Sequence, residues 1–183
     1  MKKIALLFCV LAVSACQSLP ERIIIAPNYT ATAQLSIANN IDLSVQDNRE
    51  TPTTLRILKK DDVTKVASND LEHSLNNALS KALKNSGVNI NASSQNQMAL
   101  HIHQLEVIVK QQTLKYRSEG IIELEVKLNK GKQNFNKYYN GSQNSEGPLI
   151  FDKAKVEGQL NTLLEQMISR IVNDVELQEF LQG

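Results

Sequence analysis

The chain has 183 residues, and its 20 lysines and arginines nearly balance its 19 aspartates and glutamates, for a formal net charge of +1. Without a basic surplus the chain lacks the electrostatic support that nucleic-acid binding needs, so nucleic acid is not an expected partner. The length suits one domain with its own core, and past the first 16 residues no apolar run approaches the roughly 20 residues that span a bilayer.

The first 16 residues have the organisation of a secretory signal. Lys2 and Lys3 provide a basic start, Ile4–Val13 is an unbroken apolar run, and two small residues lead into Cys16. A basic start, a short apolar run and a small-residue cleavage site are typical of an exported protein. The apolar run, about ten residues, is too short for a permanent membrane helix. The sequence therefore predicts a signal peptide over residues 1–15.

Cys16 carries a second message, because its setting resembles the lipobox of bacterial lipoproteins. In those proteins the cysteine is acylated and becomes the first residue of the mature chain. The resemblance implies attachment to a membrane by three acyl chains, whereas one chain alone binds only marginally. Gln17 is not the aspartate that retains such lipoproteins at the inner membrane. The resemblance therefore implies an outer-membrane location with the folded part facing the periplasm.

Two alternatives for Cys16 stay open, namely a plain secretory signal with an incidental cysteine and a cysteine that is only a small buried hydrophobe. Cys9 leaves with the signal peptide, so the mature chain has no cysteine for a disulfide, and its fold must depend on its core. Residues 16–21 are predicted to be a tether from the lipidated cysteine. Residues 22–183 are predicted to be a single periplasmic domain.

The first half of the mature chain favours short strands. Alternating or β-branched apolar residues indicate them, and polar or proline-containing turns separate them. The strand that ends at Asp47 alternates cleanly and is followed by the polar loop Asn48–Pro52. The expected strands are Arg22–Ala26, Ile41–Asp47, Thr54–Leu58 and Val63–Ala67, with a further extended piece at Ala33–Ile37.

The spacing of leucines and alanines predicts a helix over Asn69–Asn85, with one apolar face. Asn69 is placed as the N-cap, and Glu72 three residues later completes the pattern of a capping box. Gly87 follows the helix and suits a left-handed C-terminal cap. A strand is expected to restart at Val88–Ala92.

Three longer strands are predicted in the second half. Met98–Lys110 changes its apolar phase near Gln104, as a β-bulge would make it do. Ile122–Leu128 alternates apolar with charged residues, so one face is expected to be solvated, which favours an antiparallel sheet. After a hairpin turn, Gln133–Gln143 returns.

A second helix is predicted from about Asp152 to Asn173, where apolar residues form a wide stripe that needs a sheet to pack on. Glu176–Leu181 is expected to be a short helical tail. The predicted fold class is α+β, a single domain with a mainly antiparallel twisted sheet and two amphipathic helices packed on one face.

Residues that carry chemistry do not form a recognisable catalytic set. His101 and His103 share one strand face, but a zinc site needs at least three protein ligands, so neither a metal nor a cofactor is expected. Glu123 and Glu125 lie beside Lys127 and are interpreted as a solvated strand face. No enzyme signature is present, and the protein is predicted not to be an enzyme.

Asp47 and Arg49 are candidate binding residues, because functional side chains often lie where a strand ends in a loop. The structural alternative is a loop salt bridge or an Asx turn. The tyrosines at 116, 138 and 139 could form an exposed aromatic patch, although cross-strand packing is the simpler interpretation.

Taken in order along the mature chain, these patterns resemble the YajG family of bacterial lipoproteins. The matching features are the lipobox, Asp47-x-Arg49 at a strand end, the helix Leu71–Lys84 followed by Gly87, Leu105, Tyr116, Tyr139 with Glu146-Gly147, and Glu179-Phe180 after the final helix. The resemblance implies an outer-membrane-type lipoprotein with an α+β domain, and it carries no catalytic or binding residues.

Two functions are compatible with this sequence. The first is a non-enzymatic interaction or structural module of the cell envelope, anchored by acylated Cys16 and presenting a sheet face, edge or loop to another envelope protein. The second is a carrier or chaperone that holds an amphipathic lipid or glycolipid in an apolar groove between the helices and the sheet.

Overall fold

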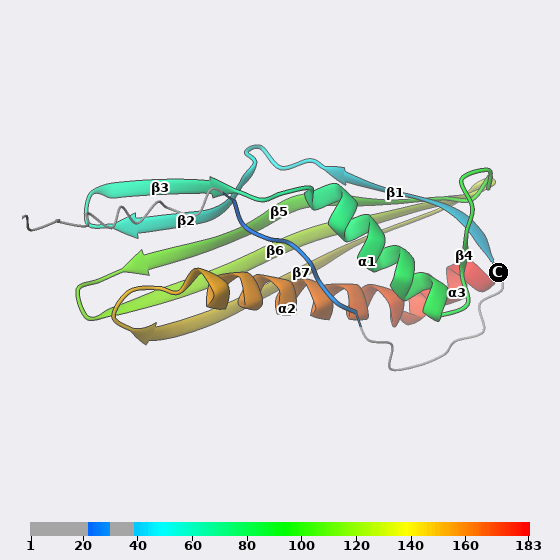
Figure 1. Cartoon of the computed structure of the whole chain (residues 1–183). Coiled ribbons are helices and arrows are strands. Elements are labelled where there is room, and N and C mark those ends of the chain that lie inside the picture. Colours follow the sequence, from blue (N-terminus) through cyan, green and yellow to red (C-terminus); the bar gives the residue numbers. More distant parts are fainter. Residues whose placement is uncertain (1–21, 30–38) are drawn as a thin grey trace, which may run out of the picture.

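The structure is a computed structural model that describes residues 22–29 and 39–183. In these residues a curled seven-stranded sheet forms one layer, and three helices form a second layer on one of its faces (Figure 1). The predicted signal peptide, Cys16, the tether and the extended piece at 33–37 lie outside the described residues. The elements are β1 (Asn40–Asp47), β2 (Thr53–Lys59), β3 (Asp62–Ala67), α1 (Leu71–Asn85), β4 (Asn89–Ile90), β5 (Gln97–Gln111), β6 (Lys115–Lys130), β7 (Gln133–Pro148), α2 (Lys153–Val172) and α3 (Val175–Gln182).

The sheet is mixed. β5–β6, β6–β7 and β2–β3 pair antiparallel, whereas β1 and β2 both pair parallel with β5, and β1 pairs parallel with β4. The predicted single α+β domain is confirmed, but the mainly antiparallel sheet and the two-helix layer are not. Alternation of apolar and polar residues shows only that one face is covered, and it does not report the direction of the neighbouring strand.

The predicted bulge in β5 is confirmed. Its pairing with β6 steps from Ile102↔Leu124 to Gln104↔Glu123, so His103 has no partner residue on β6. The extra residue reverses the phase of the strand. Apolar side chains therefore face the helices on both sides of the bulge, and the polar ones gather on the face that the helices leave uncovered.

Helix α1 begins differently from the prediction. Its N-cap is Asp70, which has a left-handed backbone with φ 37° and makes no side-chain cap. The capping box from Asn69 to Glu72 is therefore wrong, and the Glu72 carboxylate accepts a hydrogen bond from the Asp47 amide at 2.7 Å instead. Gly87 has φ 89°, as expected of a left-handed C-terminal residue.

Helices α2 and α3 each have an aspartate N-cap. Asp152 accepts from the Ala154 amide, and Asp174 accepts from two amides of the first turn of α3. The stripe predicted for α2 is buried against the sheet: Val156, Leu160, Leu163, Leu164, Met167, Ile168, Ile171 and Val172. The predicted helical tail is α3, whose Phe180 ring lies 5.7 Å from that of Phe135 on β7.

Residues 22–29 form an extended segment that runs between α1 and α2 (Figure 1). The predicted strand is thus extended, but only Ile23 makes a bridge, to Ser68. The amides of alternate residues 24, 26 and 28 donate instead to the α2 side chains Glu157, Asn161 and Glu165. Four helical residues rise about 6 Å and two strand residues rise about 6.6 Å, so the two spacings match.

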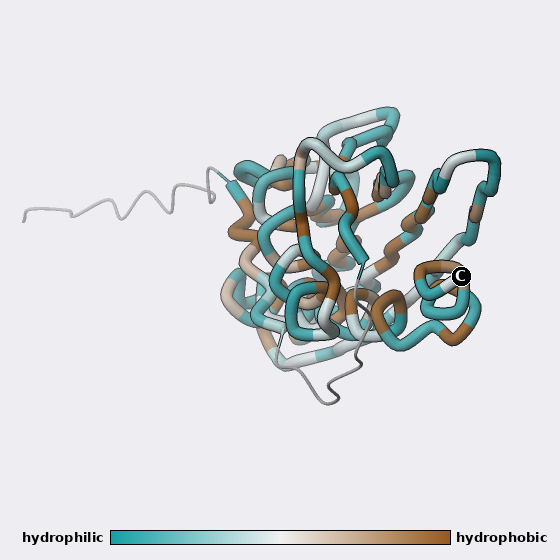
Figure 2. The backbone as a smooth tube through the Cα atoms, turned by 90° about the vertical axis from the view of Figure 1, so that its right-hand side faces the viewer, coloured by the Kyte–Doolittle hydropathy of each residue, from teal (hydrophilic) through white to brown (hydrophobic). Residues whose placement is uncertain are grey.

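Figure 2 shows hydrophobic and hydrophilic residues alternating along the strands. The core side chains of both layers are buried, and one glycine permits a close approach at the strand ends. A Cβ at Gly147 would lie 2.6 Å from the ring of Tyr116, which is buried.

Among the described helices, none is long and apolar enough to cross a membrane.

Candidate functional site at the junction of β1 and β2

Strands β1 and β2 lie end to end along the same edge of β5. β1 pairs with β5 up to Ile102, and β2 begins its pairing at Val107. Between these two pairings, residues 103–106 of β5 have no strand beside them on this edge. The loop Asn48–Pro52, the junction loop, connects β1 to β2 across this interval. Buried backbone carbonyls need hydrogen-bond partners, so this interval requires a donor from elsewhere.

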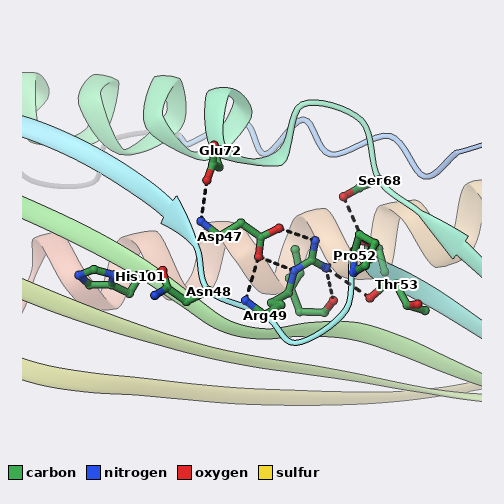
Figure 3. Close-up of polar contacts among 10 residues, drawn as sticks. Asp47, Asn48, Arg49, Pro52, Thr53, Ser68, Glu72 and His101 are labelled. Carbon is green, nitrogen blue, oxygen red and sulfur yellow. Dashed lines mark hydrogen bonds and ion pairs between the residues drawn. The ribbon is translucent and has the colours of Figure 1, made fainter.

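Arg49 provides that donor (Figure 3). Its Nη1 donates to the carbonyl oxygens of Leu105, at 3.0 Å, and Thr53, at 3.3 Å, and to the Thr54 hydroxyl at 3.1 Å. The side chain is 6% exposed. Arg49 therefore joins the end of one strand to the start of the next and takes the place of a missing strand partner.

Asp47 holds the other side of the guanidinium. Its two carboxylate oxygens accept from Nε and Nη2 of Arg49, each at 2.8 Å, and Oδ1 also accepts from the Arg49 amide at 3.2 Å. Burial raises the pKa of the Asp47 carboxyl, but the hydrogen bonds and the positive charge of Arg49 outweigh it, so the pKa is lowered. The pair thus forms both structures named as the alternative to binding, a salt bridge and an Asx turn.

The helix-free face of the sheet carries a second polar group, centred on Glu125. Its side chain is only 3% exposed, and it bonds His103 at 2.8 Å and Lys127 at 3.3 Å. Burial raises the pKa of Glu125, but hydrogen bonds from His103, Asn136, Lys127 and Tyr138 lower it to about 2. The interpretation of Glu125 as a solvated residue is therefore wrong.

His101 and His103 lie between the Asp47–Arg49 pair and the polar group around Glu125. His101 Nδ1 is 3.2 Å from the side-chain oxygen of Asn48, in the junction loop, and the His101 ring is 6.3 Å from that of His103. Burial and the nearby charge of Lys127 lower the pKa of His101, against the opposing effect of Glu125. Within the described part of the chain, no three His, Cys, Asp or Glu side chains gather as a metal site would require.

A hollow of about 430 Å³ lies between the junction loop and the bulge of β5. The loop from Asn48 to Thr53 forms one wall, and residues 103–106 with Glu123 form the other. The hollow is open to solvent and its rim is acidic, with Glu50, Glu106 and Glu123. Glu106 is neutralised by Arg56, whose Nη2 lies 2.6 Å away.

The tyrosines divide between two roles. Tyr116 and Tyr139 are each 3% exposed and pack in the core, whereas Tyr138 is half exposed beside His103 on the helix-free face. The three do not form one aromatic patch, because residues 138 and 139 point to opposite faces of β7.

The sequence pattern identified Arg49 as a partner of Asp47 and Lys127 as a neighbour of Glu125, but not their other partners. Glu72 bonds the Asp47 amide rather than its own helix, and the remaining partners of Glu125 come from β5 and β7, which lie apart from it in the sequence. The four-residue spacing of Glu157, Asn161 and Glu165 on α2 was a usable signal for a polar row along one helix face.

The family model Lipoprotein_16, described as "Uncharacterized lipoprotein", matches residues 27–182. Protein XCC0632 from Xanthomonas campestris, with family model DUF330, has a TM-score of 0.61 at 16% identity, over 86% of this chain and 96% of its own. A Helicobacter pylori homolog of neuraminyllactose-binding hemagglutinin has a TM-score of 0.51 at 8% identity, over 87% of this chain and 97% of its own. These likenesses show a shared fold. No curated protein sequence matches the chain.

Proposed function

The chain belongs to a family of uncharacterized lipoproteins, and from that premise we propose that it is anchored to the outer membrane through acylated Cys16, with its domain in the periplasm. The family match agrees with the predicted resemblance to YajG-type lipoproteins. The basic start, the short apolar run and the small residues before Cys16 support acylation at this position. Gln17, in place of aspartate, supports the outer membrane over the inner.

The anchor is tested by the variant Cys16→Ser, with Cys9→Ser as the matched control. We expect Cys16→Ser to lose incorporation of labelled palmitate and to leave the outer-membrane fraction of a density gradient, since no thioether can form. Cys9→Ser, altered within the signal peptide, should retain both. An acylated, outer-membrane-located Cys16→Ser protein would overturn the anchor.

The domain itself is proposed to act without catalysis, as an interaction module that presents the helix-free face of its sheet to another envelope protein. The observation that supports this is the way polar side chains on that face are held in place. His103, part-exposed at the rim of an open hollow, is held by the buried Glu125, and the loop Asn48–Pro52 beside it is held by the buried Arg49. A rigid polar surface binds a partner at a lower entropic cost than a mobile one.

Site-specific cross-linking tests this surface. A photoreactive residue at Thr51, which is exposed on the rim of the hollow, should capture a discrete envelope protein in intact cells. The charge reversal Glu123→Lys in the same hollow should abolish that product. A photoreactive residue at Glu179, exposed on α3, is the matched control and should not capture it. Recovery of abundant porins alone, from both positions, would contradict the proposal.

The carrier hypothesis finds less support. Leu124 on the sheet and Leu160 and Leu164 on α2 are all fully buried, so the space between the layers is filled by side chains. A lipid would have to separate the layers in order to enter. Native mass spectrometry of protein purified without detergent distinguishes the two, because a carrier retains lipid and an interaction module gives a bare mass. Neuraminyllactose binding is in the name of the Helicobacter pylori protein, and a likeness in fold at 8% identity does not transfer it.

A further inference from the structure

Three of the most exposed large apolar side chains in the described part of the chain come together at one end of the molecule. Leu114 is 74% exposed in the turn between β5 and β6, and Leu149 and Ile150, 63% and 68% exposed, follow β7. The two turns touch, because the Leu149 amide donates to the Leu114 carbonyl at 2.8 Å. We call these three residues the apolar tip; it lies at the left end of the view in Figure 1.

The apolar tip is held in a defined conformation. Leu149 has φ 61°, a left-handed conformation that residues other than glycine and asparagine seldom adopt. The side chain of Gln111 donates to the Leu149 carbonyl at 2.8 Å and accepts from the Phe151 amide at 3.0 Å. Single exposed apolar residues are ordinary, but three neighbours held outward by a dedicated side chain indicate a contact surface.

Basic residues lie close to the apolar tip in the sequence. They flank Leu114 in β5 and β6 and follow Ile150 at the start of α2: Lys110, Lys115, Arg117, Lys153 and Lys155. Arg117 and Lys153 have glutamate partners at 3.3 Å, whereas the other three have no ion pair among the residues that the structure describes. An apolar centre with a lysine rim suits the membrane interface, where apolar side chains enter the leaflet and ammonium groups stay with anionic headgroups.

The position of the predicted anchor also fits contact between the apolar tip and a membrane leaflet. Ile23 bridges to Ser68, just past the end of β3. β3 begins at the tip end of the molecule and covers the distance to Ser68 with six residues, about 20 Å (Figure 1). The six residues between Cys16 and Ile23 span up to about 20 Å when extended. The tether is therefore long enough for the tip to reach the leaflet that would hold the acyl chains.

We propose that the apolar tip, Leu114, Leu149 and Ile150 with its lysine rim, inserts into the headgroup region of the anionic phospholipid leaflet beside the anchor. The proposal rests on the proposed membrane location of the chain. It gives the domain a fixed orientation, with the tip against the lipid and the helix-free face directed sideways into the periplasm.

Vesicle flotation tests the apolar tip without the anchor. The mature chain, residues 16–183 carrying Cys16→Ser, has no acyl group and retains the whole described core, which runs from Ile23 to Leu181. We expect it to float with vesicles of phosphatidylethanolamine and phosphatidylglycerol, and less at high salt. Adding Leu114→Ser and Ile150→Ser should lower the partition coefficient about ten-fold.

The matched control adds Ile24→Ser and Val175→Ser, which also removes two exposed apolar side chains but away from the tip. It should float like the parent. A parent that does not float, or a tip variant that floats equally well, overturns the proposal. Neither result bears on acylation, since position 16 is serine in every protein compared.

A fluorescent reporter shows whether the apolar tip contacts lipid or protein. The chain has no tryptophan, so Ile150→Trp would be the sole indole emitter, with Val175→Trp as its control. Vesicles should shift the emission of Ile150→Trp to the blue and leave Val175→Trp unchanged. If vesicles have no effect and a solubilised envelope protein fraction produces the shift, the tip binds protein and the lipid proposal is overturned.

Discussion

At the scale of one residue, Arg49 shows which contacts a local sequence pattern can predict and which it cannot. Its pairing with Asp47 could be predicted, because two residues at that spacing in a loop can share a salt bridge or an Asx turn. Its bond to the Leu105 carbonyl could not, since that contact spans 56 positions and exists only because β1 and β2 share an edge of β5. The residue named as a binding candidate thus also has a structural task.

Replacing Arg49 with alanine should lower the free energy of unfolding by about 2–4 kcal/mol, because it leaves Asp47 unpaired and the Leu105 carbonyl without its donor. Urea unfolding followed by circular dichroism measures this. Arg117→Ala is the control, since its pair with Glu146 is more than 60% exposed on both sides and should change stability by less than about 1 kcal/mol. Equal effects would contradict the role assigned to Arg49.

The lowered pKa of Glu125 predicts that the stability of the fold depends on pH. Its pKa is about 2 in the folded protein against 4.5 ordinarily, so its contribution to stability is complete above pH 4.5 and is lost as the pH falls toward 2. Glu125→Gln should be less stable than the parent at pH 7 and should lose less stability over that acid interval. Urea midpoints measured from pH 7 to pH 2 compare them. Parallel curves would show that Glu125 is not the group responsible.

At the scale of the element, periodicity succeeded where one face of an element is buried. It placed α2, β5 with its bulge, and the β2–β3 hairpin, because each has apolar residues in a regular period. It failed for the cap of α1, where Glu72 bonds a distant strand end rather than its own helix. It also failed for the direction of β1 and β2, because parallel and antiparallel neighbours produce the same alternation.

The contact between residues 22–29 and α2 gives a test at this scale. Asn161 donates to the Ile24 carbonyl and accepts from the Ala26 amide, so Asn161→Ala should cost about 1–2 kcal/mol and release the segment locally. Hydrogen exchange at the Ala26 amide should accelerate while exchange in β6 stays slow. Asn134→Ala, an exposed position on β7, is the control. Unchanged protection at Ala26 would show that packing of Ile23 and Ile25 alone holds the segment.

At the scale of the whole molecule, the sequence predicted one α+β domain and a helix layer but not the exposed tip. Leu114 and Leu149 lie in separate turns and became neighbours only through the pairing of β6 with both β5 and β7. The open hollow was missed for the same reason, since its two walls come from the loop after β1 and from β5.

Tether length gives a prediction for the anchored molecule. Inserting about 20 glycine and serine residues after Gln17 should leave acylation and membrane fractionation intact. It should weaken tip contact, because the local concentration of the tip at the leaflet falls as the linker lengthens. The emission of Ile150→Trp in the reconstituted lipoprotein measures this. An unchanged blue shift would mean that the tip binds the leaflet strongly without help from the tether.

The docking of residues 22–29 on α2 also has a consequence for biogenesis. The amide of Ile24 and its acceptor Glu157 are 133 positions apart, and export proceeds from the amino terminus. The stretch beside Cys16 would thus emerge from the secretion channel well before the helix that secures it. During that interval the modifying and cleaving enzymes would meet an unfolded segment. The segment would dock on α2 only after the carboxy-terminal third of the chain had been exported.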